Sequence, residues 1–168
     1  MKTYQKKVCL LGDFAVGKTS LIRRFVERRF DEKYHTTVGV VVSRKRLTYT
    51  DHSVSLLIWD LAGGREFHQT GYLAGVAGGM LVCDLTRHST LAIFRQNAEQ
   101  LRAVNPEVRL VLIANKSDLS NERAISDEEL AAIAAELNTP LFVTSAKTGD
   151  DVDRAFILLA DLLVTEAS

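Results

Sequence analysis

The sequence predicts an α/β protein whose sheet is mostly parallel and covered by helices on both faces. Short apolar runs alternate with amphipathic segments, as expected for parallel strands joined by crossover helices. The runs are residues 8–11, 56–59, 80–83, 110–114 and 141–143. A further extended run at 40–50 precedes 54–59 across a short turn at 51–53. This pattern indicates a hairpin, and therefore one antiparallel strand at the edge of the sheet.

Helical periodicity marks the segments between the strands. It covers residues 19–27, 91–104, 127–137 and 152–164. The third segment has a start signal, because Ser126 and Glu129 have the spacing of a capping box. The polar, aperiodic stretches 28–37 and 62–70 are interpreted as mobile loops. No repeat, linker or low-complexity tract divides the chain, which predicts one domain over residues 1–168.

Composition argues against several classes of function. Lys+Arg and Asp+Glu are balanced at 21 each, so no strong field favours nucleic acid or an anionic membrane. Cys9 and Cys83 lie in apolar runs, and we expect buried thiols in a reducing cytosol, with a disulfide between neighbouring strands as the alternative. We find no leader, no apolar segment near the roughly 18 residues that span a bilayer, and no cysteine for prenylation at the end. The expectation is a cytoplasmic protein without a lipid anchor.

The most informative motif is GDFAVGKT at residues 12–19, which has the spacing G-x-x-x-x-G-K-[ST] of a phosphate-binding loop. It follows an apolar run and precedes a helical segment, the context that such a loop needs. Backbone N–H groups would turn inward, Lys18 would reach the outer phosphates, and the Thr19 hydroxyl would bind Mg²⁺. A chance glycine turn is the alternative, which both spacing and context oppose. The predicted nucleotide contacts here are Asp13, Phe14, Ala15, Val16, Gly17, Lys18, Thr19 and Ser20.

Two further segments predict contacts to the metal and the γ-phosphate. The Asp60 carboxylate, at the end of a predicted strand, can hold Mg²⁺ directly or through water, and the Gly63 N–H can touch a γ-phosphate. Alone, D-x-x-G is usually a turn, but its place at the carboxyl end of a parallel strand strengthens the prediction. Thr37 is a candidate second Mg²⁺ ligand from the first loop. From that segment alone, a polar loop threonine before an edge strand is the favoured alternative.

Residues 115–118 predict guanine as the base. The Asp118 carboxylate can accept hydrogen bonds from the N1–H and exocyclic amine of guanine, whereas adenine presents no such donor pair. With adenine bound, the carboxylate would be left without a hydrogen-bond partner. A site whose polar groups are left unpaired in this way discriminates against the analogue by a factor of about 10⁴–10⁵. Asn115 and the stem of Lys116 would fix the loop and cover the base. The backbone N–H groups of Ser145-Ala146-Lys147 could reach the guanine O6, although a serine-capped turn is the alternative for that segment alone.

Together these motifs resemble the Ras superfamily of small GTPases, and within it the Rab-like branch. The resemblance spans residues 8–164 and rests on segments 12–19, 37–39, 59–63, 84–86, 115–118 and 144–149. It implies a three-layer P-loop GTPase fold with a six-stranded, mostly parallel sheet, one antiparallel edge strand and five helices. It implies Mg²⁺ and GTP or GDP as ligands, switch I at 28–39 and switch II at 61 to about 75. Phe30 would then pack edge-on to the guanine ring, and Tyr34 and Leu119 join the nucleotide contacts.

The same resemblance assigns catalysis to Lys18, Thr37, Gly63 and the position of Gly64, but the chain departs from the family there. The family places a glutamine that orients the attacking water where Gly64 stands, and Gln69 is not counted as its substitute. Phe14 replaces the usual glycine or serine and would fill the space of a partner's arginine finger. Such an arginine accelerates GTP hydrolysis by about 10³–10⁵-fold. Residues 40–42 are all valine, where Rab proteins usually carry an aspartate and a phenylalanine.

These observations predict a guanine-nucleotide switch that hydrolyses GTP slowly. An effector protein would read switch I and switch II, an exchange factor and an activating protein are possible partners, and nucleic acid is not expected. The alternative from another class is a GTP-bound scaffold with negligible hydrolysis. An ATP-using kinase is disfavoured by Asp118 and by the lack of an acceptor-site lid.

Overall fold

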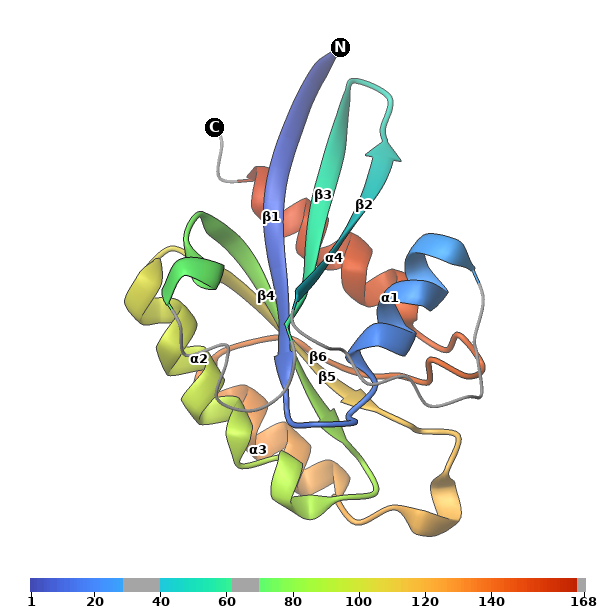
Figure 1. Cartoon of the computed structure of the whole chain (residues 1–168). Coiled ribbons are helices and arrows are strands. Elements are labelled where there is room, and N and C mark those ends of the chain that lie inside the picture. Colours follow the sequence, from blue (N-terminus) through green and yellow to red (C-terminus); the bar gives the residue numbers. More distant parts are fainter. Residues whose placement is uncertain (29–39, 62–69, 166–168) are drawn as a thin grey trace.

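The computed structural model describes residues 1–28, 40–61 and 70–165, and shows one sheet between two layers of helices (Figure 1). The sheet has six strands in the order β2-β3-β1-β4-β5-β6. Every neighbouring pair is parallel except β2 with β3, which is antiparallel. The predicted sheet is therefore confirmed. Its strands are β1 (Lys2–Gly12), β2 (Val40–Thr48), β3 (His52–Leu61), β4 (Val76–Asp84), β5 (Arg109–Asn115) and β6 (Leu141–Val143).

Four α-helices lie within the described residues, where the resemblance implied five helices. Residues 62–69, within the predicted switch II, are outside the described part of the chain. The helix predicted at 127–137 has the expected boundaries and capping box: Glu129 N donates to Ser126 Oγ at 3.1 Å, and Ser126 N donates to Glu129 Oε1 at 3.2 Å. The elements are α1 (Lys18–Glu27), α2 (Ile93–Val104), α3 (Asp127–Leu137) and α4 (Val152–Thr165), with the short 3-10 helices η2 (Thr70–Leu73), η3 (His88–Thr90) and η4 (Ser120–Glu122).

Each face of the sheet has its own hydrophobic core. Helices α1 and α4 cover one face, and α2 with α3 covers the other (Figure 1). On the first face the rings of Phe25 and Phe156 stack with their centroids 4.2 Å apart, which joins α1 to α4. Phe94 and Leu101 of α2 are fully buried on the second face. Alternating strand residues feed the two cores, so the strands are apolar on both sides, as the sequence predicted.

The hairpin between β2 and β3 turns earlier than predicted. The turn was expected at residues 51–53, but β3 begins at His52, and Tyr49 N donates to His52 O at 2.8 Å. The His52 ring stacks on Tyr49 with centroids 4.5 Å apart and meets the Tyr4 ring edge-on at 5.9 Å. His52 pairs with Lys2 of β1, and these ring contacts accompany that pairing at the start of the strand. Likewise β1 extends back to Lys2, because its polar half pairs with the start of β3.

Both cysteines are free and buried, as predicted, and neither forms a disulfide. Cys9 lies in β1 and Cys83 in β4, and burial raises the pKa of each thiol to about 12. Within the described ranges, no helix has the length and apolar character needed to cross a bilayer.

Candidate nucleotide-binding site

The predicted site residues gather where the parallel strands end. Gly12 closes β1, Asp60 lies one residue before the end of β3 and Asn115 closes β5. Asp84, to which the sequence analysis gave no role, closes β4 between them. Ligands of open α/β sheets bind at this carboxyl edge. The topology therefore brings the phosphate-loop, metal and guanine motifs together, although 103 positions separate Gly12 from Asn115 in sequence.

Two glycines of the phosphate loop are required by its geometry. Gly17 has φ +105°, and a Cβ there would lie 2.3 Å from Asn115 Nδ2. A Cβ on Gly12 would lie 2.5 Å from the carbonyl oxygen of Val82. Real Cβ atoms do not approach other atoms so closely, so any side chain at either position would push apart the loop and its support. The glycine spacing seen in the sequence thus follows from contacts with β4 and β5.

Lys18 begins α1 and folds back over the loop. Its Nζ donates to the carbonyl oxygens of Gly12 at 3.2 Å and Asp13 at 3.3 Å, and the side chain is buried. Burial lowers the pKa of Lys18; the charges of Asp60 and Asp13 oppose this shift, and that of Arg87 adds to it. A phosphate in the loop would supply the anion that a buried ammonium needs.

The predicted metal ligands from two distant motifs are in contact. Thr19 Oγ1 donates to Asp60 Oδ2 at 2.5 Å, and Asp60 is buried at the end of β3. A hydroxyl and a carboxylate are hard oxygen donors of the kind that Mg²⁺ prefers beside nucleotide phosphates. The residues present therefore fit a magnesium ion. The third predicted ligand, Thr37, lies outside the described residues.

Asn115 connects three segments. Its Nδ2 donates to Val16 O at 3.1 Å, and its Oδ1 accepts from Thr144 Oγ1 at 3.0 Å and from Ala146 N at 3.3 Å. The side chain is buried, so these partners satisfy its amide. The residue predicted to fix the guanine loop thereby also ties the phosphate loop to the segment that follows β6.

Lys116 adopts φ +74° and points toward the phosphate loop. Its Nζ donates to Ala15 O at 2.9 Å and forms an ion pair with Asp84 Oδ2 at 2.8 Å. Asp84 is buried, which alone would raise its pKa, but hydrogen bonds from Lys116, Thr86 and Arg87 outweigh burial and hold the pKa below its ordinary value. Sequence reasoning gave Asp84 no role. Its position at the end of β4, beside the other motifs, was the available signal.

Asp118 is oriented by the last predicted segment. Ser145 Oγ donates to Asp118 Oδ1 at 2.8 Å and accepts from Thr148 N at 3.0 Å. Arg24 of α1 donates to Ala146 O at 2.8 Å and also to Lys147 O, which anchors this segment to α1. The structure therefore joins the two guanine motifs through their side chains, in addition to the backbone role predicted for residues 145–147.

The remaining predicted residues divide into two groups. Phe14 lies on the phosphate loop with half of its surface exposed, Ser20 continues α1, and Leu119 follows Asp118 with 37% of its surface exposed. The other group lies outside the described residues and consists of Phe30, Tyr34, Thr37, Gly63 and Gly64. Their roles stay predictions from the sequence.

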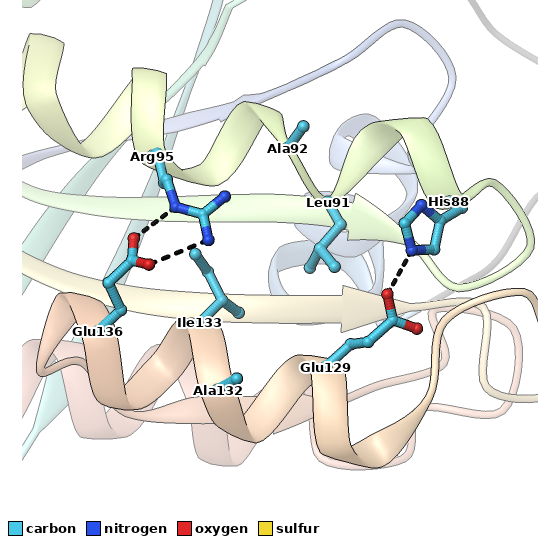
Figure 2. Close-up of a pocket in the computed structure, with 8 residues that line it drawn as sticks. All are labelled: His88, Leu91, Ala92, Arg95, Glu129, Ala132, Ile133 and Glu136. Carbon is cyan, nitrogen blue, oxygen red and sulfur yellow. Dashed lines mark hydrogen bonds and ion pairs between the residues drawn. The ribbon is translucent and has the colours of Figure 1, made fainter.

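A cavity of about 310 Å³ lies elsewhere, between α2 and α3 (Figure 2). Leu91 and Ile133 contribute apolar surface, and two exposed ion pairs bridge its walls, His88 with Glu129 and Arg95 with Glu136. None of its lining residues belongs to a nucleotide motif. The cavity is therefore separate from the candidate nucleotide site.

Comparison with known proteins agrees with this geometry. The family model described as "Ras family" matches residues 7–165. The Ras-related protein SEC4 of Saccharomyces cerevisiae is 36% identical over 160 residues, which are 94% of this chain and 74% of the yeast protein. The chain belongs to the Ras family. The predicted resemblance to the Rab-like branch is confirmed. This protein is therefore a small GTP-hydrolysing enzyme and nucleotide switch. Proteins of this family generally bind GTP or GDP, Mg²⁺, effectors, exchange factors and activating proteins.

Proposed function

We propose that this Ras-family protein is a guanine-nucleotide switch whose own hydrolysis of GTP is slow. One contrast carries the proposal: the groups that would hold the nucleotide are connected to one another, whereas residue 64 is a glycine. Asn115, Lys116 and Ser145 all have hydrogen-bond partners within the motifs. Gly64, at the position where the family has glutamine, has no side chain with which to orient a water molecule.

Binding follows from the arrangement of these side chains. Asp118, held by Ser145, would accept both guanine donors, and the Lys18 ammonium would neutralise the outer phosphates. Thr19 and Asp60 would hold Mg²⁺, which when bound stabilises negative charge on the β- and γ-phosphates. Because these electrostatic contributions do not depend on residue 64, some hydrolysis is retained.

Phe14 supports a second part of the proposal, namely resistance to an activating protein that supplies an arginine. Phe14 lies on the phosphate loop, and 50% of the residue surface is exposed. An arginine from a partner would need to approach past this position to reach the γ-phosphate. A Rab-directed activator that brings its own glutamine would compensate for Gly64, but it would still meet the Phe14 ring.

The nucleotide that copurifies with the protein tests the function directly. The protein is purified without added ligand and denatured, and the released nucleotide is identified by chromatography. Bound GDP shows that GTP is hydrolysed during expression. Bound GTP favours the alternative, a scaffold held in one state. Bound ATP, or no guanine nucleotide after incubation with GTP, would contradict the proposal.

Single-turnover hydrolysis tests the role of residue 64. Gly64→Gln should raise the rate by about tenfold, because an amide that positions the attacking water adds to the transition-state interactions. Ser89→Gln is the control, since Ser89 is exposed and lies outside the nucleotide motifs and both predicted switches. Equal rates for the wild type and Gly64→Gln would show that Gly64 does not limit hydrolysis.

A further inference from the structure

Three successive carbonyl oxygens of the phosphate loop each accept a hydrogen bond from a distant side chain. The pairs are Asn115 Nδ2 to Val16 O at 3.1 Å, Lys116 Nζ to Ala15 O at 2.9 Å and Arg87 Nη2 to Phe14 O at 2.6 Å. Asn115 and Lys116 belong to the predicted guanine motif. Arg87, which follows β4, belongs to none of the predicted motifs and makes the shortest of the three bonds.

These bonds determine which way the loop's amides face. In a trans peptide the C=O and the following N–H point in opposite directions. A donor that holds the carbonyl of Phe14 outward therefore turns the N–H of Ala15 inward, where loops of this kind cradle phosphates. Lys116 acts in the same way on the N–H of Val16, and Asn115 on that of Gly17.

Ala15 particularly needs such support. It has φ +64°, in the left-handed region that residues with a Cβ rarely occupy. Strained backbone of this kind persists when surrounding contacts fix it. Arg87 and Lys116 hold the carbonyls on the two sides of Ala15, so together they fix both peptides that this residue joins.

The position of Arg87 is itself fixed by a buried carboxylate. Arg87 Nε donates to Asp84 Oδ2 at 3.0 Å, and Lys116 pairs with the same oxygen at 2.8 Å. Thr86 holds the other oxygen through its N at 2.8 Å and its Oγ1 at 2.6 Å. Asp84 is 1% exposed and ends β4, so a rigid strand sets the place of both cations.

We propose that Arg87 is a positioning residue for the nucleotide phosphates, which acts by holding the Phe14 carbonyl so that the Ala15 N–H faces the β-phosphate end of the ligand. This inference rests on the proposed guanine-nucleotide binding but not on the rate of hydrolysis. It gives Asp84 a function as well, as the common anchor of the two cations that orient the loop.

Paired measurements with GDP and GMP test the role, because GMP lacks the β-phosphate. Arg87→Ala should weaken GDP binding by about tenfold, the order expected for a hydrogen bond to a charged group, and should change GMP binding by less than about twofold. Dissociation constants are measured by calorimetry with Mg²⁺ present. Arg95→Ala is the control, because Arg95 is likewise an arginine paired with a carboxylate but lies on α2 beside Glu136.

Two conservative variants separate hydrogen bonding from charge, and keep the test available if Arg87→Ala does not fold. Arg87→Gln removes the charge but keeps an N–H donor, and Arg87→Lys keeps both a donor and the charge. We expect both to retain GDP affinity better than alanine does. If lysine restores binding while glutamine does not, a neutral donor is not sufficient and the charge is required, which overturns the proposal that Arg87 acts through its hydrogen bond to the Phe14 carbonyl.

Other outcomes also overturn it. Equal losses for GDP and GMP would show that Arg87 supports the site as a whole, and wild-type GDP affinity in Arg87→Ala would show that the loop does not need it. If the wild-type protein binds neither nucleotide, the proposed function fails instead, which distinguishes the two failures.

Discussion

The end of the candidate site that would hold the guanine base, called here the base end, differs from the end near the γ-phosphate, called the mouth. The two ends differ in how their side chains are supported. At the base end, Asn115, Asp118 and Ser145 are joined by hydrogen bonds that link the ends of β5 and β6 to the phosphate loop. At the mouth, Phe14 is half exposed. Residue 64, which the resemblance assigns to catalysis but which lies outside the described residues, is a glycine and has no side chain. We therefore expect nucleotide affinity and hydrolysis to depend on different residues, so that one can be retained while the other declines.

The largest expected effect comes from removing the charge at the base end. Asp118→Asn should weaken GDP binding by about 10⁴-fold, because its NH₂ group would face a guanine donor and leave both unpaired. Xanthosine diphosphate should gain affinity, since its C2 carbonyl can accept from that NH₂. Competition binding with the two nucleotides measures both changes.

Asp51→Asn is the control for this experiment, as the Asp51 side chain is 85% exposed in the hairpin turn. If Asp118→Asn keeps GDP affinity, the base end does not recognise guanine and the comparison with the mouth loses its basis.

The two thiols offer a test of whether either region opens on its own. Cys9 lies in the strand that leads to the phosphate loop, and Cys83 directly precedes Asp84. Burial raises the pKa of both from 9.0 to about 12, so near pH 8 the reactive thiolate is about 10³-fold scarcer than in the unfolded chain. We expect both to be alkylated equally slowly by iodoacetamide, as measured by mass spectrometry.

The pH dependence of thiol labelling should follow from the raised pKa values. Because the native pKa is raised, labelling of the folded protein should stay low as pH increases from 7 to 9, whereas a guanidinium-unfolded control should gain thiolate throughout that range. Faster labelling at Cys83 alone would mean that the end of β4 opens locally, and Asp84, which anchors Lys116, would then support the base end less firmly than proposed.

Sequence reasoning predicted the sheet and the phosphate and guanine motifs because each depends on local pattern. Residues 12–19 and 115–118 carry their chemistry within a few positions, and the capping box at Ser126 is local too. The start of β3 was misplaced because His52 is held by ring contacts with Tyr49 and Tyr4, and the contact with Tyr4 comes from a separate strand.

Arg87 was missed for a related physical reason. Its partner is a backbone carbonyl 73 positions away, and any residue type could provide that oxygen. Nothing in the identity of Phe14 therefore signals the contact. The role of Asp84 was missed in the same way, since a carboxylate at a strand end gains its partners only when Lys116 and Arg87 fold onto it.

A moderate effect is expected where one hydrogen bond supports the base end. Ser145→Ala removes the donor to Asp118 Oδ1 and the acceptor for Thr148 N, so GDP dissociation should accelerate by about tenfold. Stopped-flow release of a fluorescent GDP analogue measures the rate. Ser89→Ala, an exposed serine outside the motifs, is the control. An unchanged rate for Ser145→Ala would show that Asp118 is oriented without Ser145.

The smallest effect on binding should come from the mouth. Phe14→Gly should change GDP release by less than about threefold, because it keeps two backbone hydrogen bonds that hold the loop: Phe14 N donates to Asp13 Oδ1 at 2.8 Å, and its carbonyl accepts from Arg87 at 2.6 Å. Glycine retains both groups. The same variant should allow an arginine-supplying Rab-directed activator to accelerate single-turnover hydrolysis, whereas we expect the wild type to resist that activator. A large increase in GDP release without any gain in activation would make Phe14 a binding residue, and affinity and hydrolysis would then no longer be separable by position.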